Sequence, residues 1–428
     1  MIFFRLALKS LRNRFTSTVL TVLSISLSVT LLLAVERTKR AAEEGFTQSV
    51  SQVDLLVGGR TGPVNLILYS VFNMGSASNN ISWESYQEIK NLPEVAWTIP
   101  YSLGDGHRGF RVVATDENFY EHYRFRGNQK VELLEGQPAL DVWDVVLGSD
   151  VYKKLKYKVG EPVVIAHGVT RGEGLLFHDD KPFRVVGILQ PTGTALDQSL
   201  YISLYGMEAI HIDWKYSESS DSKKENSHTK KASSQTELKK ENIKIGPITS
   251  FFLRTKSRVE TLRLQRFINN YTSEPLLAII PGVTLSELWG SLSQIDVVLK
   301  IISFMVLIVG LAAMVSTILA GLNERRREMS ILRSLGAGPL RLTSLLVFES
   351  CLLTSLAILV GVIINSVLFL FLSGWLANQF GFYIQGSSYS KIEFIYLALI
   401  WLFGTLVGFI PAIKASRLAL KDGLSVRV

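Results

Sequence analysis

The chain has 428 residues, of which 47% are hydrophobic and 19% charged, and its mean hydropathy of +0.25 indicates a membrane protein rather than a soluble one. The formal net charge is +8, but residues 1–16, 322–341 and 412–428 carry +4, +3 and +3, so the rest of the chain is slightly acidic. All three segments flank long apolar runs, and no zinc-finger or aromatic–basic RNA motif accompanies them. The charge therefore argues against nucleic acid as a partner and favours cytoplasmic loops beside membrane lipid.

Four apolar stretches are long enough to cross a bilayer, which takes about 20 residues. They are residues 17–35, 297–321, 342–375 and 394–413. Ahead of the first, residues 1–16 place Arg5, Lys9 and Arg12 at helical spacing beside apolar residues, which predicts an interfacial elbow helix. The first stretch is longer than the apolar part of a signal peptide and no convincing cleavage site follows it, so we expect a retained membrane helix.

The basic segments also predict the topology. Residues 1–16, the loop at 322–341 and the tail at 414–428 are expected in the cytoplasm under the positive-inside rule. Residues 36–296 and the short loop at 376–393 would then lie outside the cytoplasm. We therefore predict four transmembrane helices with a large domain between the first and the second.

The segment from 36 to 296 is too long and too patterned for a loop, so it predicts a folded domain. Runs rich in Val, Ile and Phe, such as FRVVATD and FRVVGIL, alternate with helix-like stretches such as SWESYQEIKNL. This pattern favours a mixed α+β fold. The chain has one cysteine, Cys351, so the domain must be stabilised by its own core without an intrachain disulfide.

Two helix starts and one insertion are visible inside the domain. Ser257 with Glu260, and Thr284 with Glu287, form capping-box patterns. The second of these helices is expected to run directly into the second membrane stretch. The lysine- and serine-rich residues 215–244 predict a disordered insertion, with a basic arm that recruits a partner as the alternative.

Five stretches share motifs with a known family. ALKSLRNRFTSTVLTVLSISLSV begins at Ala7. The stretch VVLGSDVYKKLKYKVGEPVVIAHG, followed by KPFRVVGILQPTGTALDQSLYISL, contains a VxLG strand, a short helix, a VGxxV strand and an FxVVGI strand in order. NERRREMSILRSLGAG lies between two membrane stretches, and PAIKASRLALKDGL lies near the end. These stretches resemble the MacB/LolC/FtsX-type permeases of ABC transporters, including their MacB-like periplasmic core domain.

This resemblance implies a non-enzymatic permease subunit of the bacterial inner membrane. The chain has no G-x-x-x-x-G-K-[ST] phosphate loop, so a separate ABC ATPase would bind ATP and magnesium and the permease itself would need no cofactor. A second permease copy or a paralogue would complete a dimer. The dimer would transmit ATPase movement outward to export or extract a lipoprotein, lipid, peptide or drug, with or without a periplasmic adaptor or carrier. The alternative is an FtsX-like regulator of a cell-wall hydrolase that transports nothing.

The charged stretch between the second and third membrane stretches is the predicted ATPase contact. As a helix closed by two glycines and a proline, it would place Ile331, Leu332 and Leu335 near one face, where they could fill a groove on the ATPase. The full set assigned to coupling is Glu324, Arg325, Arg326, Arg327, Glu328, Ile331, Leu332, Leu335, Gly336 and Ala337. The alternative is a positive-inside anchor whose arginines touch only lipid headgroups.

Two further groups are candidates. Glu349 lies eight residues beyond Arg341, about 12 Å along a helix, and an acid within the membrane is a candidate proton or ion site. A structural bond to a neighbouring helix or backbone is the favoured role for Glu349. A glycine-rich segment of the outer domain carries apolar residues that either pack as a buried loop or strand, or touch a hydrophobic substrate or partner. These are Leu66, Ile67, Leu68, Val71 and Phe72.

Neither a metal site nor a catalytic site is expected. The six histidines form no HExxH or paired Cys/His pattern. The chain also lacks a G-x-S-x-G elbow.

The coupling hypothesis predicts that apolar residues matter more than arginines. Burying a leucine side chain contributes about 1.5–3 kcal/mol, whereas an exposed ion pair contributes about 0–1 kcal/mol. Leu332→Glu should therefore reduce ATPase co-purification and ATP hydrolysis more severely than Arg326→Ala. The reverse ranking in the same two assays would contradict this model of the contact.

Overall fold

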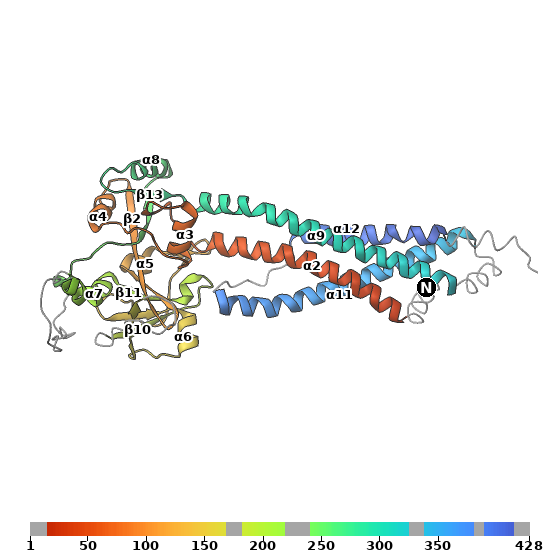
Figure 1. Ribbon diagram of the computed structural model, residues 1–428, viewed down its shortest axis with the longest axis horizontal. Coiled ribbons are helices and arrows are strands. Elements are labelled where there is room, and N and C mark those ends of the chain that lie inside the picture. The colour runs from red at the N-terminus through yellow and green to blue at the C-terminus, as the bar shows by residue number, and fades with distance from the viewer. Residues whose placement is uncertain (1–14, 168–181, 219–239, 325–337, 381–388, 415–428) are drawn as a thin grey trace, which may run out of the picture. The chain divides into compact units, whose positions relative to one another are not determined.

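The computed structural model describes residues 15–167, 182–218, 240–324, 338–380 and 389–414. The chain divides into a first unit, residues 1–41, 292–374 and 385–428, and a second unit, residues 42–291 and 375–384. Figure 1 shows that the first unit is helical and that the second contains a sheet. Most of the predicted elbow helix and of the C-terminal tail lies outside the described residues. The loop predicted at 376–393 was too long at both ends, because one helix continues to Phe380 and the next begins at Lys391; positions 381–388 are not described.

Among the described residues, four helices are long and apolar enough to cross a membrane, as predicted. They are α2 (Phe15–Gln48), α9 (Pro281–Glu324), α11 (Pro339–Phe380) and α12 (Lys391–Val407). The apolar spans are Phe15–Ala41, Gln294–Ala320, Leu340–Leu372 and Lys391–Lys414. A mixed α/β domain lies between the first span and the second, so the predicted fold class is confirmed.

The membrane helices pack closely where glycines face small side chains. Thr30 Oγ1 on α2 donates to the carbonyl oxygen of Gly361 on α11 over 3.1 Å, and a Cβ at Gly361 would lie 2.9 Å from the side chain of Val29. Ser28 Oγ donates in the same way to the carbonyl of Val306 on α9 over 3.1 Å. Lipid supplies little hydrophobic driving force between helices, so such close contacts and hydrogen bonds stabilise the bundle.

Two of these helices are much longer than a bilayer requires. The 34 residues of α2 and the 44 residues of α9 extend over about 51 Å and 66 Å, against about 30 Å for the hydrocarbon core. The predicted continuity of the helix into the second membrane stretch is confirmed, because α9 runs unbroken from Pro281.

The predicted starts of two helices had different outcomes. Ser257 is the N-cap of α8 (Arg258–Asn269), where its side chain accepts from the Val259 N–H. The helix start predicted at Thr284 was wrong, since α9 begins three residues earlier, at Pro281. Proline suits the first helical position because its ring presets φ and its missing N–H is not needed there.

The described residues of the second unit form an 11-stranded mixed sheet. Its main path follows the order β13-β1-β12-β2-β3-β11-β7-β10-β6, with β8 paired to β10 and β9 paired to β2. The strands are β1 (Leu55–Gly59), β2 (Val95–His107), β3 (Phe110–Thr115), β6 (Leu133–Gly136), β7 (Asp144–Leu147), β8 (Pro162–Val163), β9 (Ala166–His167), β10 (Phe183–Leu189), β11 (Ser199–Ser203), β12 (Ser250–Thr255) and β13 (Leu276–Ile279). A separate hairpin pairs β4 (Arg124–Phe125) with β5 (Gln129–Lys130).

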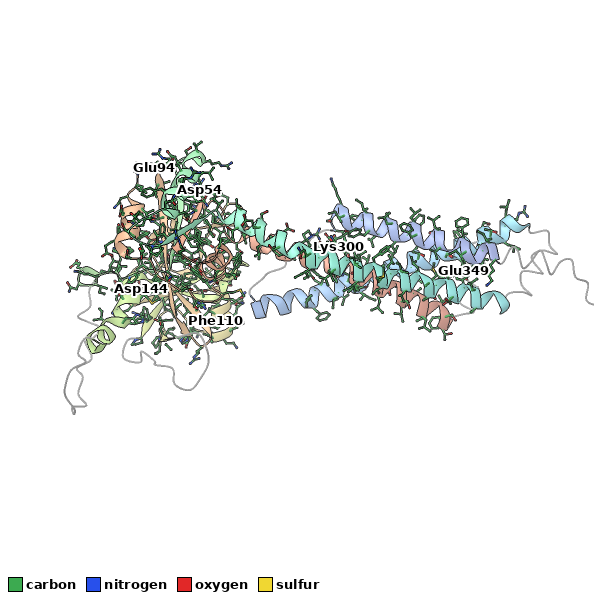
Figure 2. The ribbon with its side chains drawn as sticks, turned by 45° about the horizontal axis from the view of Figure 1, so that its top comes forward. Asp54, Glu94, Phe110, Asp144, Lys300 and Glu349 are labelled. Atoms are coloured by element: carbon green, nitrogen blue, oxygen red, sulfur yellow. The ribbon has the colours of Figure 1, made fainter. Side chains whose placement is uncertain are left out.

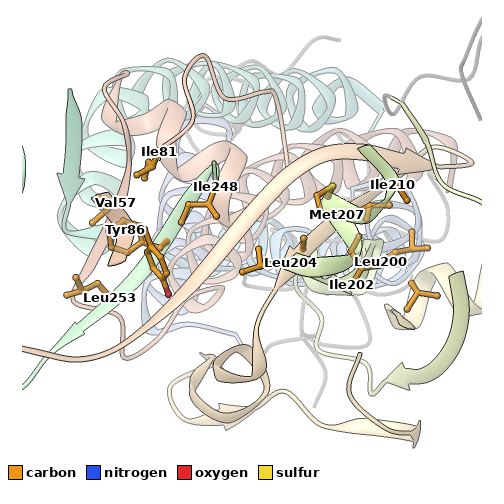
Figure 3. Close-up of a cluster of buried hydrophobic side chains, with 14 of the residues drawn as sticks. Val57, Ile81, Tyr86, Leu200, Ile202, Leu204, Met207, Ile210, Ile248 and Leu253 are labelled. Carbon is orange, nitrogen blue, oxygen red and sulfur yellow. The ribbon is translucent and has the colours of Figure 1, made fainter. Parts of the chain in front are cut away.

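Hydrophobic side chains cover both faces of this sheet. On β12, Phe251 and Leu253 enter one core cluster, and Phe252 enters another. On β11, Leu200 and Ile202 likewise belong to the first cluster and Tyr201 to the second. Figure 3 shows part of the first cluster. A strand buried on both faces carries a continuous apolar run instead of an alternating one, which explains the VVL, LYI and SFFL runs.

The longest strand, β2, was not predicted. It has 13 residues and pairs with β12 through its first half and with β3 through its second. Pro100, Gly104 and Gly106 interrupt its apolar pattern, and these residue types argue against a central strand. The pairing of β2 with β3 is irregular between Leu103 and Gly106. This irregularity includes Gly104 and lies where the main partner of β2 changes from β12 to β3.

Helices cover the sheet at several places. They are α3 (Pro63–Val71), α4 (Trp83–Lys90), α5 (Glu117–His122), α6 (Ser149–Leu155), α7 (Leu204–Glu218) and α8. The helix α7 includes the first residues of the predicted disordered insertion, and a 3-10 turn, Lys240–Asn242, includes some of its last. The remainder of that prediction, residues 219–239, lies outside the described residues.

The packing of α3 generates a stability prediction. Leu66 is fully buried, and a Cβ at Gly58 on β1 would collide with it. Leu66→Ala should therefore lower the stability of the outer domain by about 2–5 kcal/mol, whereas Leu68→Ala, at a partly buried position, should cost less. Tryptophan-monitored thermal unfolding of the full-length protein in detergent measures both. A larger loss for Leu68→Ala would contradict the placement of α3.

Candidate functional site

The C-terminal half of α2 carries a group of charged side chains that contact the other three membrane helices. Glu36 and Lys39 pair with residues of α9, and Arg37 and Arg40 pair with α12. Residues three apart lie close together on a helix surface. The sequence ERTKR therefore presents two pairs of charges, each directed to its own neighbours.

The α2 side chains Arg37 and Arg40 belong to the more deeply buried group, which we call the Glu393 cluster. Its members are Arg37, Arg40, Asn365, Phe369, Tyr389 and Glu393. Glu393 is fully buried, and its Oε1 lies 3.4 Å from Arg37 Nε while its Oε2 lies 3.3 Å from Arg40 Nη2. Arg37 also donates to Asn365 Oδ1 on α11 over 3.2 Å. One carboxylate thus pairs with two guanidinium groups from one helix.

Aromatic rings complete the surroundings of Arg37. Its Cζ lies 4.9 Å from the ring centroid of Phe369 and 4.3 Å from that of Tyr389. The Tyr389 hydroxyl is 2.9 Å from Ser366 Oγ on α11. Guanidinium groups bind aromatic faces favourably when desolvated, so Arg37 can stay buried with its positive charge satisfied.

Glu393 also caps the N-terminal end of α12. Its carboxylate accepts from the Ser390 backbone N–H while the Ser390 side chain accepts from the first turn, a complete capping box. The acid lies at the positive end of the helix dipole, which favours a negative charge there. The same side chain therefore sets where α12 starts and how α12 is attached to α2.

The other two α2 side chains, Glu36 and Lys39, form a second group with Asp296 and Lys300 of α9. We call these four residues the Lys39 bridge. Asp296 Oδ2 on α9 lies 2.9 Å from Lys39 Nζ and 3.1 Å from Lys300 Nζ, and Lys300 reaches back to Glu36 over 3.4 Å. The lysine side chains are about one third exposed. This bridge is more exposed than the Glu393 cluster, so each of its pairs contributes less to stability. Figure 2 labels Lys300 on α9.

The two groups together connect all four membrane helices through charged side chains of α2. They contain no nucleophile paired with a base. Their chemistry is attachment: opposite charges in a poorly solvated place resist any sliding of one helix past another that would separate them.

Sequence reasoning did not identify this site. The first membrane stretch was ended at Val35, so the charges that follow were assigned to the outer domain, and Glu393 was assigned to a loop. The S-x-x-E pattern at Ser390 is a signal that could have placed Glu393 at a helix start.

The predicted ATPase-coupling residues lie almost entirely outside the described residues. Glu324 is the last residue of α9, and positions 325–337 are not described, so this assignment stays a prediction. Glu349 lies on α11 and is buried, with 6% of its surface exposed. Figure 2 labels it at a different level of the bundle from Lys300. It therefore belongs to neither charged group.

The apolar residues proposed to touch a substrate lie on or beside α3. The segment is a helix and not the loop or strand of the first alternative, although it is buried as that alternative predicts. Leu66, Ile67, Val71 and Phe72 are buried in the core of the domain, and Leu68 is partly buried. Their observed role is packing, and a contact with substrate or partner stays a prediction that would require the segment to open.

Within the described part of the outer domain, buried polar groups offer no second cluster of charged side chains that joins several helices. His107 is held between the carbonyl of Val164, 2.6 Å from its Nδ1, and the hydroxyl of Tyr157, and burial lowers its pKa. His211 Nε2 lies 3.5 Å from the buried Asp105. Among the described residues no group of three or more acidic, histidine or cysteine side chains could hold a metal ion.

Comparisons with known proteins match both halves of the chain. The family model described as MacB-like periplasmic core domain matches residues 18–256, more than half of the chain, and the model described as FtsX-like permease C-terminal matches residues 300–420. No curated protein matches the chain.

Two solved structures are similar to part of the chain. The periplasmic region of MacB from Actinobacillus actinomycetemcomitans has 10% identity and a TM-score of 0.34, covering 56% of this chain and 94% of its own. The extracellular domain of the noncanonic ABC-type transporter YknZ from Gram-positive bacteria has 10% identity and a TM-score of 0.30, covering 53% and 98%.

The Glu393 cluster generates a prediction about stability. Glu393→Gln keeps an acceptor for the helix cap but removes the charge that pairs with Arg37 and Arg40, so it should destabilise the bundle by about 3–5 kcal/mol. Lys39→Gln, which breaks a more exposed pair, should cost about 1 kcal/mol or less. Thermal unfolding in one detergent measures both variants. Equal losses would show that the cluster is not the stronger attachment.

Proposed function

Because the chain belongs to the MacB/FtsX-type family of ABC transporter permeases, we propose that it carries the movement of a separate ATPase to its extracytoplasmic domain. The family places it as a multi-pass protein of the inner membrane with an extracytoplasmic domain, and implies an ABC ATPase partner and a dimer. The proposed task is export or extraction of a substrate from the periplasm or outer leaflet. Its chemical class would be a lipoprotein, lipid, peptide or drug.

The observation that carries this proposal is the length of α2 and α9. Both helices continue without a break beyond their apolar spans. The C-terminal end of α2 extends past Ala41 to Gln48, and the N-terminal end of α9 begins at Pro281, before the span that starts at Gln294. An unbroken helix resists bending, so a displacement at its cytoplasmic end reaches its other end. ATP and magnesium would be bound by the partner, and the permease would supply only the mechanical connection.

The charged groups on α2 support the same proposal. Because α2 is attached to α12 and α11 by the Glu393 cluster and to α9 by the Lys39 bridge, displacement of one helix is shared among the four. Breaking a buried ion pair is costly, so tilting of the whole bundle would need less energy than sliding of single helices. The coupling segment at 325–337, between α9 and α11, is the proposed place where the ATPase applies its force.

An FtsX-like regulator of an extracytoplasmic cell-wall hydrolase is the second candidate. It would use the same membrane helices, since the FtsX-like model matches residues 300–420. The match of the MacB-like core model to residues 18–256 favours export, because FtsX-like outer domains are smaller.

A deletion strain tests the two roles. Export predicts that a lipoprotein, lipid, peptide or drug accumulates in or outside the inner membrane when the chain is absent. The wild-type chain should reverse the accumulation, and Leu332→Glu, present at the same level, should not. Loss of cell-wall hydrolysis without such accumulation would select the regulatory role, and full activity of Leu332→Glu would contradict ATPase coupling through this segment.

A further inference from the structure

The helix α8 is firmly attached to the outer domain by one face. Leu264 and Ile268 are buried in the core, and the helix packs against β12 and β13. Gln265 Nε2 and Asn269 Nδ2 both donate to the carbonyl of Ala278 on β13, over 3.1 Å and 3.2 Å. The opposite face of α8 is therefore presented in a fixed orientation.

That opposite face carries three exposed apolar side chains. Val259 is 84% exposed, Leu262 is 65% exposed and Phe267 is 46% exposed. Arg263 and Arg266 are exposed beside them. We call these five residues the α8 outer face.

The order of these residues around the helix matters more than their number. With about 100° per residue, the exposed arc follows the order Leu262, Arg266, Val259, Arg263, Phe267. Apolar and cationic side chains alternate across the arc, so no part of the face is purely apolar or purely basic.

We propose that the α8 outer face docks an extracytoplasmic protein whose surface presents carboxylates around an apolar pocket. Val259 and Leu262 would enter the pocket, and Arg263 and Arg266 would pair with the carboxylates. Arginine binds carboxylates through two parallel hydrogen bonds, and arginine and aromatic residues are enriched at protein interfaces. The proposal rests on the extracytoplasmic location of the domain and not on what is transported.

Other occupants fit this pattern less well. A symmetric contact between two copies of the chain would bring arginines against arginines, which is repulsive. A membrane surface favours helices with the cationic residues on one side and the apolar residues on the other. Here burial of Val259 in lipid would carry the flanking Arg266 and Arg263 towards the hydrocarbon.

The size of the face indicates the kind of complex. The 12 residues of α8 extend over about 18 Å, so one face of the helix is smaller than the roughly 800 Å² per partner of a standard stable interface. The contact should therefore be transient, and because it includes charges it should weaken as salt is added.

The first test places a photocrosslinking amino acid at Leu262 of the full-length chain in cells. The control carries it at Leu134, which is also exposed, at 57%, but lies on β6. We expect an adduct with another extracytoplasmic protein at position 262 and not at 134. An adduct only with a second copy of the chain, an adduct only with lipid, or no adduct would each overturn the proposal.

The second test measures binding of the captured protein, once purified, to the full-length chain in detergent. Arg263→Glu/Arg266→Glu should weaken it at least tenfold, and 300 mM salt should weaken the wild-type complex. The matched control Lys130→Glu/Lys158→Glu makes the same change in net charge at exposed positions elsewhere and should change binding less than twofold. Equal losses for both pairs would overturn the proposal. Both double variants should still co-purify with the ATPase, which separates failure of this surface from failure of the proposed function.

Discussion

The structure of the membrane unit depends on one buried carboxylate. Glu393 has no exposed surface, and a charge in such a place is stable only if opposite charges and hydrogen-bond donors surround it. Arg37 and Arg40 supply the charges, and the Ser390 N–H supplies a further donor. The position of α2 beside α12 therefore follows from an electrostatic requirement as well as from packing.

This requirement explains why the helices act together in the proposed function. Apolar side chains in lipid can exchange one apolar neighbour for another at little cost, because lipid tails are as apolar as leucine. The Glu393 cluster cannot exchange its partners in this way. The more exposed Lys39 bridge allows some adjustment between α2 and α9, since water can replace one of its pairs. The four helices are thus joined by one strong and one weaker attachment.

The outer domain follows a different physical logic. The central strands of its sheet are buried on both faces and carry continuous apolar runs, whereas a covering helix such as α8 buries one face and exposes the other. Val259 and Leu262 are exposed there beside arginines, in contrast to the apolar residues of α3, which the core requires. Apolar residues of α3 and of α8 therefore differ in role because of their places in the fold.

Local sequence determined much of this protein. The four membrane helices follow from the length of their apolar stretches, most sheet strands from runs of Val, Ile and Phe, and the start of α8 from Ser257, because each depends on neighbouring residues and on the period of the backbone. Tertiary structure alone decided the rest. The strand β2 forms despite Pro100 and Gly104 because long-range pairing with β12 and β3 outweighs their poor propensity. Arg37 and Glu393 are separated by more than 350 residues in the sequence, and no local pattern relates one to the other. Only the folded chain brings their charges together. The free-energy cost of burying either charge depends on which residues surround it, and the order of residues in the chain does not reveal those neighbours.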